Sequence, residues 1–218
     1  MRNVKFCIAA IAALVMGMSI ANAQITVRAG VGLPMGSFAD GSNTDWGVIT
    51  GENGVSALGY NAGIEYRIPL VSDLSLMFTG DFMYSGLTSE AKDNLDKINC
   101  SAPSYFNIPL MAGANYNVKM GNSLSLFVEG GLGLNVRLLT DATVPIVGDI
   151  SFKPAFTFAF QGGAGVKFQE RYSLDVNYYV LGKADVKGTY TLPIIGETDY
   201  TGGSLAPQFL TIRLGYDF

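Results

Sequence analysis

Hydrophobic and polar residues alternate along the last nine positions of the chain. Polar or small side chains occupy the odd positions, and apolar ones the even positions, namely Leu210, Ile212, Leu214, Tyr216 and Phe218. A period of two over nine residues predicts a β-strand with one apolar and one polar face. This segment is therefore expected to separate an apolar environment from a polar one.

Eight segments with this alternation are predicted to be strands: residues 24–33, 58–68, 74–84, 106–118, 124–136, 156–168, 172–180 and 209–218. A tilted strand needs about 9–11 residues to cross a bilayer, and each segment has about that length or slightly more. Tight turns are expected at 69–73, 119–123 and 169–171, and long loops at 39–54, 87–104, 137–154 and 182–206. The sequence predicts an all-β fold, an eight-stranded antiparallel up-and-down transmembrane β-barrel with short periplasmic turns and long outer loops.

The two faces of the predicted strands differ in content. One face carries large apolar residues such as Tyr60, Leu110 and Phe158, with no charged residue in any strand. The other face is small and polar, with many glycines, for example Gly131 and Gly163. An eight-stranded barrel has room inside only for side chains, so the polar face is predicted to point inward and the apolar face to meet lipid. The alternative is a soluble lipocalin-like barrel or sandwich with the apolar face inside, which would leave few charges on its water-facing surface.

Charged residues on the inward face form the predicted site: Arg28, Glu65, Arg67, Asp81, Glu129, Lys167, Asp175 and Arg213. Asp217 adds a fifth acid to the four bases. Charges in a narrow interior are costly unless they are paired, so this near balance predicts an internal ion-pair network that also blocks a continuous water path. Paired carboxylates such as Asp81 and Glu129 remain possible candidates for acid–base chemistry, although their simplest role is to neutralise the inward bases.

The amino-terminal segment predicts a signal peptide over residues 1–23, followed by a barrel domain over 24–218. Arg2 and Lys5 precede an apolar run that ends in the cleavage motif Ala21-Asn22-Ala23. A buried N-terminal helix is the alternative. The whole chain is 49% hydrophobic but only 15% charged, against about 25% charged residues in a typical soluble domain. This composition favours a barrel whose apolar residues are spread over alternate positions.

Charge and residue content exclude several functions. Residues 24–218 hold 12 basic and 18 acidic residues, a net charge of −6, which makes a nucleic-acid partner unfavourable. The absence of histidine excludes Ser–His catalysis and the usual His/Cys metal sites, so no enzyme activity and no cofactor are expected. Cys100 is the one cysteine after the signal segment, which rules out an internal disulfide and leaves either a reduced thiol or a bond to another chain.

The long loops carry weaker patterns. Three acids in the first loop, Asp40, Asp45 and Glu52, are either solvated or able to bind a divalent cation. A short helix is predicted over Ser89–Ile98, with Ala91, Leu95 and Ile98 on one face. The pair Gly202-Gly203 predicts a turn. Trp46 and Tyr200 are candidates for contact with an extracellular partner.

Two segments resemble a known family. The run Tyr105-Phe106-Asn107-Ile108-Pro109-Leu110-Met111 resembles the aromatic-x-x-Ile-Pro-Leu segment of the small porin-like outer-membrane barrel family, and residues 30–38 are similar to that family's first strand and loop. The architecture also resembles OmpA/OmpX-type eight-stranded barrels. The resemblance implies location in the outer membrane, with lipid, lipopolysaccharide and the barrel-assembly machinery as partners. It implies that the terminal strand with its final phenylalanine is the membrane-insertion signal, but it implies no common activity.

Two functions are compatible with these patterns. The first is a structural or surface-interaction barrel with a closed polar interior and long extracellular loops. The second is a narrow porin-like channel for small solutes or ions, favoured by a glycine-rich interior that leaves more free volume than bulky side chains would.

Overall fold

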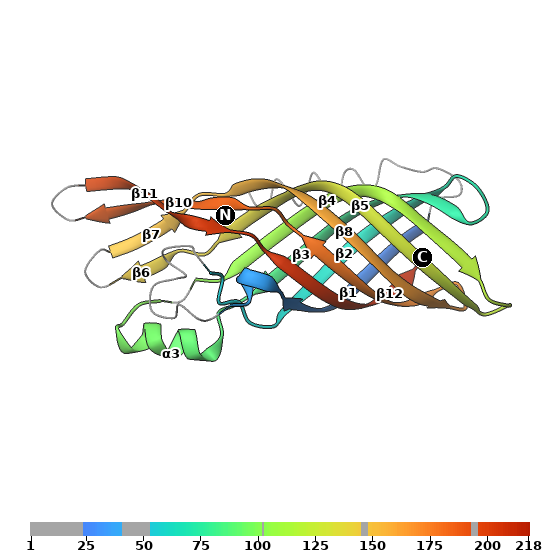
Figure 1. Cartoon of the computed structure of the whole chain (residues 1–218), viewed down its shortest axis with the longest axis horizontal. Coiled ribbons are helices and arrows are strands. Elements are labelled where there is room, and N and C mark those ends of the chain that lie inside the picture. Colours follow the sequence, from blue (N-terminus) through green and yellow to red (C-terminus); the bar gives the residue numbers. More distant parts are fainter. Residues whose placement is uncertain (1–23, 41–52, 102, 145–147, 193–195) are drawn as a thin grey trace.

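The computed structural model describes residues 24–40, 53–101, 103–144, 148–192 and 196–218. Its main body is a closed antiparallel barrel with the strand order β1-β12-β9-β8-β5-β4-β3-β2 (Figure 1). The barrel strands are β1 (Gln24–Pro34), β2 (Gly59–Pro69), β3 (Leu74–Ser85), β4 (Tyr105–Lys119), β5 (Leu124–Leu139), β8 (Ala155–Phe168), β9 (Tyr172–Val180) and β12 (Gln208–Asp217). The eight predicted strands are confirmed. Only β5 departs from its predicted bounds by more than one residue, because it continues to Leu139.

The barrel closes between its first and last strands. Thr26 of β1 pairs with Asp217 of β12, so the start of β1 and the end of β12 lie at the short-turn end. The predicted signal peptide at residues 1–23 lies outside the described residues. No described helix is long and apolar enough to cross a membrane.

The apolar face of the strands lies on the outside. Tyr60, Leu132 and Phe158 are 67%, 63% and 73% exposed, whereas the charged side chains of the predicted network are at most 6% exposed. No outward position of the eight barrel strands carries a charged residue. A water-facing surface of this kind would be insoluble, which rules out the inverted soluble barrel.

A second, four-stranded sheet lies beyond the long-loop end of the barrel (Figure 1). We call it the outer sheet. It consists of β6 (Ala142–Val144), β7 (Gly148–Phe152), β10 (Ala184–Leu192) and β11 (Gly196–Leu205), in the order β11-β10-β7-β6. The long connections predicted at 137–154 and 182–206 are therefore present, but they contain strands that the sequence analysis does not predict. Gly202-Gly203 lies within β11 and not in a turn, at the point where the register with β10 shifts.

The outer sheet continues the barrel wall in register. The β8–β9 ladder stops at the pair Phe160–Val180 and resumes between β7 and β10 at Phe152–Gly188, with the same offset. The breaks in the three long strands fall at Lys153–Pro154, at residues 181–183 and at Ala206–Pro207. Proline cannot donate a ladder hydrogen bond, and Gly182 has a φ of +71°, so these residues explain why the strands break there.

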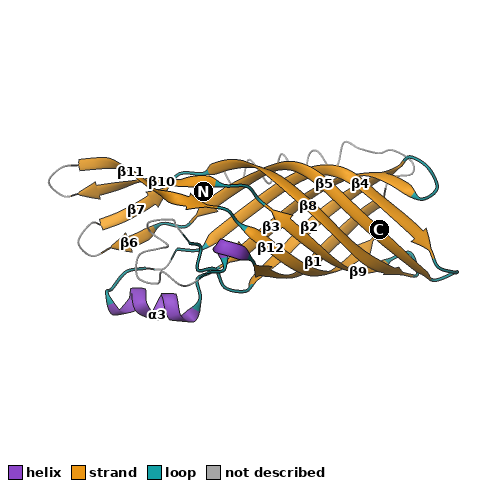
Figure 2. Ribbon diagram, in the orientation of Figure 1, coloured by secondary structure: helices purple, strands orange, loops and turns teal. Residues whose placement is uncertain are grey.

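The long loop between β3 and β4 contains α3 (Ser89–Lys97), drawn as the longer purple helix in Figure 2. Thr88 caps its amino terminus by accepting a hydrogen bond from the Ala91 backbone N–H, and Glu90 lies in the first turn, where it complements the helix dipole. The predicted helix is confirmed, with Ala91 and Leu95 buried. Ile98, which was predicted to share their face, is the C-cap of α3 and is 42% exposed.

Candidate functional site in the barrel interior

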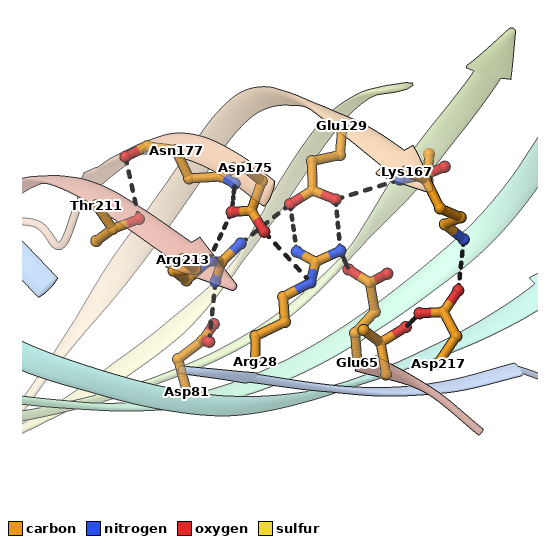
Figure 3. Close-up of polar contacts among 12 residues, drawn as sticks. Arg28, Glu65, Asp81, Glu129, Lys167, Asp175, Asn177, Thr211, Arg213 and Asp217 are labelled. Carbon is orange, nitrogen blue, oxygen red and sulfur yellow. Dashed lines mark hydrogen bonds and ion pairs between the residues drawn. The ribbon is translucent and has the colours of Figure 1, made fainter. Parts of the chain in front are cut away.

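Arg28 on β1 lies at the middle of the interior network (Figure 3). Its Nη1 lies 2.7 Å from Oε1 of Glu129 and its Nη2 lies 3.0 Å from Oε2, a two-point contact from β1 to β5. Nη2 also lies 2.8 Å from Oε2 of Glu65 on β2. The planar guanidinium matches this geometry because its donors form a rigid fork.

Arg213 on β12 forms the second half of the same cluster (Figure 3). Its Nε lies 2.7 Å from Oδ1 of Asp175, its Nη1 lies 3.1 Å from Oδ1 of Asp81, and its Nη2 lies 3.2 Å from Oε1 of Glu129. The hydroxyl of Tyr179 accepts a hydrogen bond from Nη1 of Arg213 and donates one to Oδ2 of Asp81. Glu129 thus joins the two arginines into one network.

A third set of pairs lies toward the short-turn end. Nε of Arg67 lies 2.9 Å from Oε1 of Glu65, and Nη2 lies 2.8 Å from Oδ1 of Asp217. Lys167 places its Nζ 2.5 Å from Oδ2 of Asp217, and the other oxygen of this carboxylate accepts a hydrogen bond from the Thr26 hydroxyl. The eight charged residues of the predicted site, together with Asp217, thus lie in contact across the barrel.

Arg137 is a tenth buried charge that sequence reasoning placed in a loop. It lies on the extension of β5, is 1% exposed, and donates hydrogen bonds to the carbonyl oxygens of Leu205 and Ala184, each at 2.9 Å. The alternation of β5 continues through Arg137, so the same period-two signal predicts its inward direction. With Arg137 included, five buried bases and five buried acids point into the barrel along the described strands.

The inward glycines make room for neighbouring side chains. A Cβ on Gly63 would collide with Oδ1 of Asp81, and one on Gly163 would collide with Oδ1 of Asn177. A Cβ on Gly165 would similarly meet the ring of Phe127 at 2.5 Å. The expectation that glycine leaves free volume in the interior therefore does not hold at these positions, because cross-strand side chains occupy the space.

Large apolar side chains close the long-loop end of the barrel. We call this cluster the apolar plug; its main members are Phe38, Val55, Leu87, Leu95, Tyr105, Leu181, Leu205 and Phe209. The ring of Phe38 makes edge contacts with Tyr105 and Phe209, at centroid distances of 5.0 and 5.3 Å. The Tyr105 hydroxyl donates to the Gly54 carbonyl at 2.7 Å. The plug packs the short 3₁₀ helix η1 (Gly36–Phe38), the base of α3 and the outer sheet onto the barrel mouth.

Some buried amide groups have no hydrogen-bond partner among the described residues. Both polar atoms of Asn61 and of Gln161 are in this state, as is the hydroxyl of Thr79. Polar groups buried in this way are normally satisfied by water or protein partners.

The remaining candidates form no recognisable site. Among the described residues, no group of three or more His, Cys, Asp or Glu is placed to hold a metal ion. Asp45, Trp46 and Glu52 lie outside the described residues, and Asp40 is exposed. Cys100 is a buried free thiol that packs in the apolar plug.

A closed eight-stranded antiparallel barrel, apolar outside and ion-paired inside, defines an outer-membrane β-barrel protein. The chain belongs to the outer membrane protein beta-barrel domain family, whose model matches residues 8–218, and it resides in the outer membrane. No curated protein matches the sequence.

Solved structures with this fold include a major outer membrane protein of Thermus thermophilus, with a TM-score of 0.57 and 12% identity over 90% of this chain and 100% of that one. OprG of Pseudomonas aeruginosa gives a TM-score of 0.53 and 12% identity, over 89% of this chain and 95% of that one. Ail of Yersinia pestis, in complex with the heparin analogue sucrose octasulfate, gives 0.50 and 11%, over 90% and 99%. At such low identity the likeness shows the fold alone.

Proposed function

We propose that this protein is a structural and surface-interaction barrel of the outer membrane, with a closed interior and with no enzyme activity. The observation that carries this proposal is the pair of obstructions in series: the network around Arg28, Glu129 and Arg213, and the apolar plug above it. Ion pairs that span the interior leave no continuous water path between them. The interior then serves to hold the barrel rigid, and the long-loop end presents the surface on which a partner binds.

The terminal strand is the proposed insertion signal for the barrel-assembly machinery. Leu214 and Phe218 are 68% and 77% exposed on the lipid side, and the rings of Tyr172, Tyr216 and Phe218 form a row of edge contacts at 5.4 and 5.0 Å. Leu210 and Ile212 share this outward face with them. Replacement of Phe218 by alanine should lower insertion in cells, while spontaneous refolding in detergent is expected to remain.

Conductance tests the closed interior directly. Residues 24–218 are refolded, shown to be folded by heat-modifiable gel mobility, and inserted in a planar bilayer. We expect no steady single-channel currents from the folded protein. Reproducible openings that persist in folded samples would overturn the closed-barrel proposal.

A narrow channel is the second candidate, favoured by the unpartnered amides of Asn61 and Gln161, which need water to satisfy them. In that case the inward charges would act as its selectivity elements. Small currents whose ion selectivity changes in Glu129→Gln would support the channel over the structural barrel.

A further inference from the structure

Arg137 differs from the other inward bases in what it contacts. Each of the other four bases forms an ion pair with at least one inward acid, and all five inward acids are engaged in these pairs. Arg137 forms no ion pair with any residue that the structure describes. The inward bases and acids are thus equal in number, but the charge of Arg137 has no counter-charge in contact with it.

Backbone carbonyls hold two of the three guanidinium nitrogens of Arg137. Nη1 donates to Leu205 and Nη2 to Ala184, each at 2.9 Å, and Nη2 also lies 3.4 Å from the Asp185 carbonyl oxygen. The ionisable side chains near enough to act on this charge are Tyr105, an uncharged donor to a backbone carbonyl, and Asp185, which is exposed to solvent. Carbonyl groups satisfy hydrogen bonds but carry no net charge, so burial of this guanidinium is costly without a counter-ion.

Two N–H donors without a partner lie at this level of the barrel. Nε of Arg137 and Nδ2 of Asn107 form no hydrogen bond with any described residue. The two residues are opposite each other in the β4–β5 ladder, point inward, and are 1% and 0% exposed. Opposed side chains on one face have Cβ atoms about 4.5–5.5 Å apart, so both donors can reach one point between them.

The neighbouring Asn135 orients one of these donors. Nδ2 of Asn135 donates to Oδ1 of Asn107 at 3.1 Å, so the Asn107 amide presents its nitrogen on its other side. Oδ1 of Asn135 also has no partner among the described residues, but it is an acceptor and needs a donor. The two unpartnered donors therefore come from Arg137 and Asn107, and one of them carries a positive charge.

The apolar plug limits the size of any ligand at this level. Leu205, which Arg137 contacts, is 1% exposed, and Val186 and Tyr105 are 2% and 0% exposed. All three belong to the cluster that closes the long-loop end of the barrel. A ring or an acyl chain would have to displace these side chains, whereas a single ion would not.

We propose that Arg137 and Asn107 form a binding site for one small monovalent anion, with chloride as its occupant. Chloride accepts hydrogen bonds from Nε of Arg137 and Nδ2 of Asn107, and it supplies the missing counter-charge. Water would satisfy the two donors but would leave the charge uncompensated. Arg137 also holds Ala184 and Leu205, the first ladder pair of β10 and β11, so an occupied site fastens the outer sheet to the barrel.

Urea unfolding of refolded residues 24–218 in detergent tests the site, in sodium chloride and in sodium gluconate at equal ionic strength. Screening of the ion pairs is the same in both salts, so a difference between them reports specific binding. The midpoint of the native chain should rise with chloride and then saturate, as ligand binding to the folded state requires. An equal rise in gluconate would overturn the proposal.

Two variants locate the anion. Arg137→Gln should abolish the chloride-specific rise, whereas the matched control Arg171→Gln, which removes an exposed arginine at the short-turn end, should keep it. Asn107→Leu removes one hydrogen bond to the anion and should weaken chloride binding by about tenfold. Heat-modifiable mobility shows that each variant is folded. A chloride-specific rise that persists in Arg137→Gln, or unchanged affinity in Asn107→Leu, would overturn the assigned position.

A measurement on the native chain alone keeps the proposal open to test if a variant does not fold. The chloride-35 magnetic resonance line should broaden in the presence of the folded protein, and added bromide should reverse the broadening by competition. A line as narrow as that in detergent without protein would overturn the site, since water alone would then occupy it.

Discussion

The middle of the barrel and its long-loop end fill similar spaces with opposite chemistry. In the middle, arginines and carboxylates from β1, β2, β3, β5, β9 and β12 pair across the interior. At the long-loop end, Phe38, Tyr105 and Phe209 pack as an ordinary apolar core. One continuous barrel thus uses ion pairs in the part that lipid surrounds and hydrophobic packing in the part that the loops cover. Each region is predicted to fail in its own way.

The largest loss of stability is expected for a substitution in the ion-pair network. Glu129→Gln removes the charge that joins Arg28 to Arg213, and breaking a buried ion pair costs about 3–5 kcal/mol because the partners are left uncompensated. The free energy of unfolding, measured in urea with refolded protein in detergent, should fall by about that amount.

The matched control for this variant is Glu170→Gln. This variant breaks the ion pair between Glu170 and Lys119. The side chain of Lys119 is 64% exposed and that of Glu170 is 70% exposed, so the free energy of unfolding should stay almost unchanged. An equal loss in both variants would show that burial of the charge does not decide the cost.

A substitution in the apolar plug should lower the stability of the protein without affecting the ion-pair network. Phe38→Ala removes a ring that is only 1% exposed, and such truncations lower the free energy of unfolding by about 3–5 kcal/mol. We expect a value at the lower end of this range, because the segments that cover the plug can relax into the space. Conductance should stay absent, because the ion pairs below the plug still fill the barrel. Steady currents in folded Phe38→Ala would show that the plug alone closes the interior.

A smaller change in stability is expected for glycine substitutions, and two neighbouring glycines should differ in it. Gly163→Ala places a Cβ against Asn177, and overpacking of this kind costs about 1–3 kcal/mol. Gly162→Ala, one residue away on the outer face, meets nothing within 4 Å and should be neutral or slightly stabilising. The difference in urea midpoint between these two variants measures how tightly the interior is packed, and equal midpoints would contradict a filled interior.

The smallest effect is expected in the outer sheet. The hydrogen bond and charge of Lys153 lower the pKa of Asp199 below its ordinary value. Because the folded pKa is the lower one, the pair stabilises the sheet above the pKa of the unfolded chain, about 4, and this contribution is lost as the pH falls through the folded pKa. The protection factors of the amide hydrogens in β7, β10 and β11, which are corrected for the pH dependence of intrinsic exchange, should fall slightly between about pH 5 and pH 3. Lys153→Gln should remove that pH dependence, and its persistence there would assign the effect to another group.

The fold was accessible from sequence because alternation is a strong signal in long strands. The inward direction of the charged residues follows from the same alternation. The alternation also gives the inward direction of Arg137, but the predicted strand ended at Val136 and so did not include it. Parity also places Met77, Met83 and Phe127 inside, so the interior is less uniformly polar than its glycines suggested.

The outer sheet was harder to predict. Its strands are short or interrupted by Gly202-Gly203, and they follow breaks at Pro154, Gly182 and Pro207 that are equally typical of loops. Their register is set by the barrel strands that they extend, which is a tertiary property that no local pattern contains. The contribution of Phe38 to the plug depends in the same way on strands far along the chain.

The ion pairs join strands that are made at very different times. Arg28 meets Glu129 across 101 positions of the chain, and Arg213 meets Asp81 across 132. A sheet that lacks its final strand therefore holds carboxylates without their arginine, and these cannot face acyl chains in that state. A partly assembled sheet must therefore keep its charged inward face in water or against another protein until β12 pairs with the other strands. Closure of the wall and neutralisation of its contents are then a single step in biogenesis.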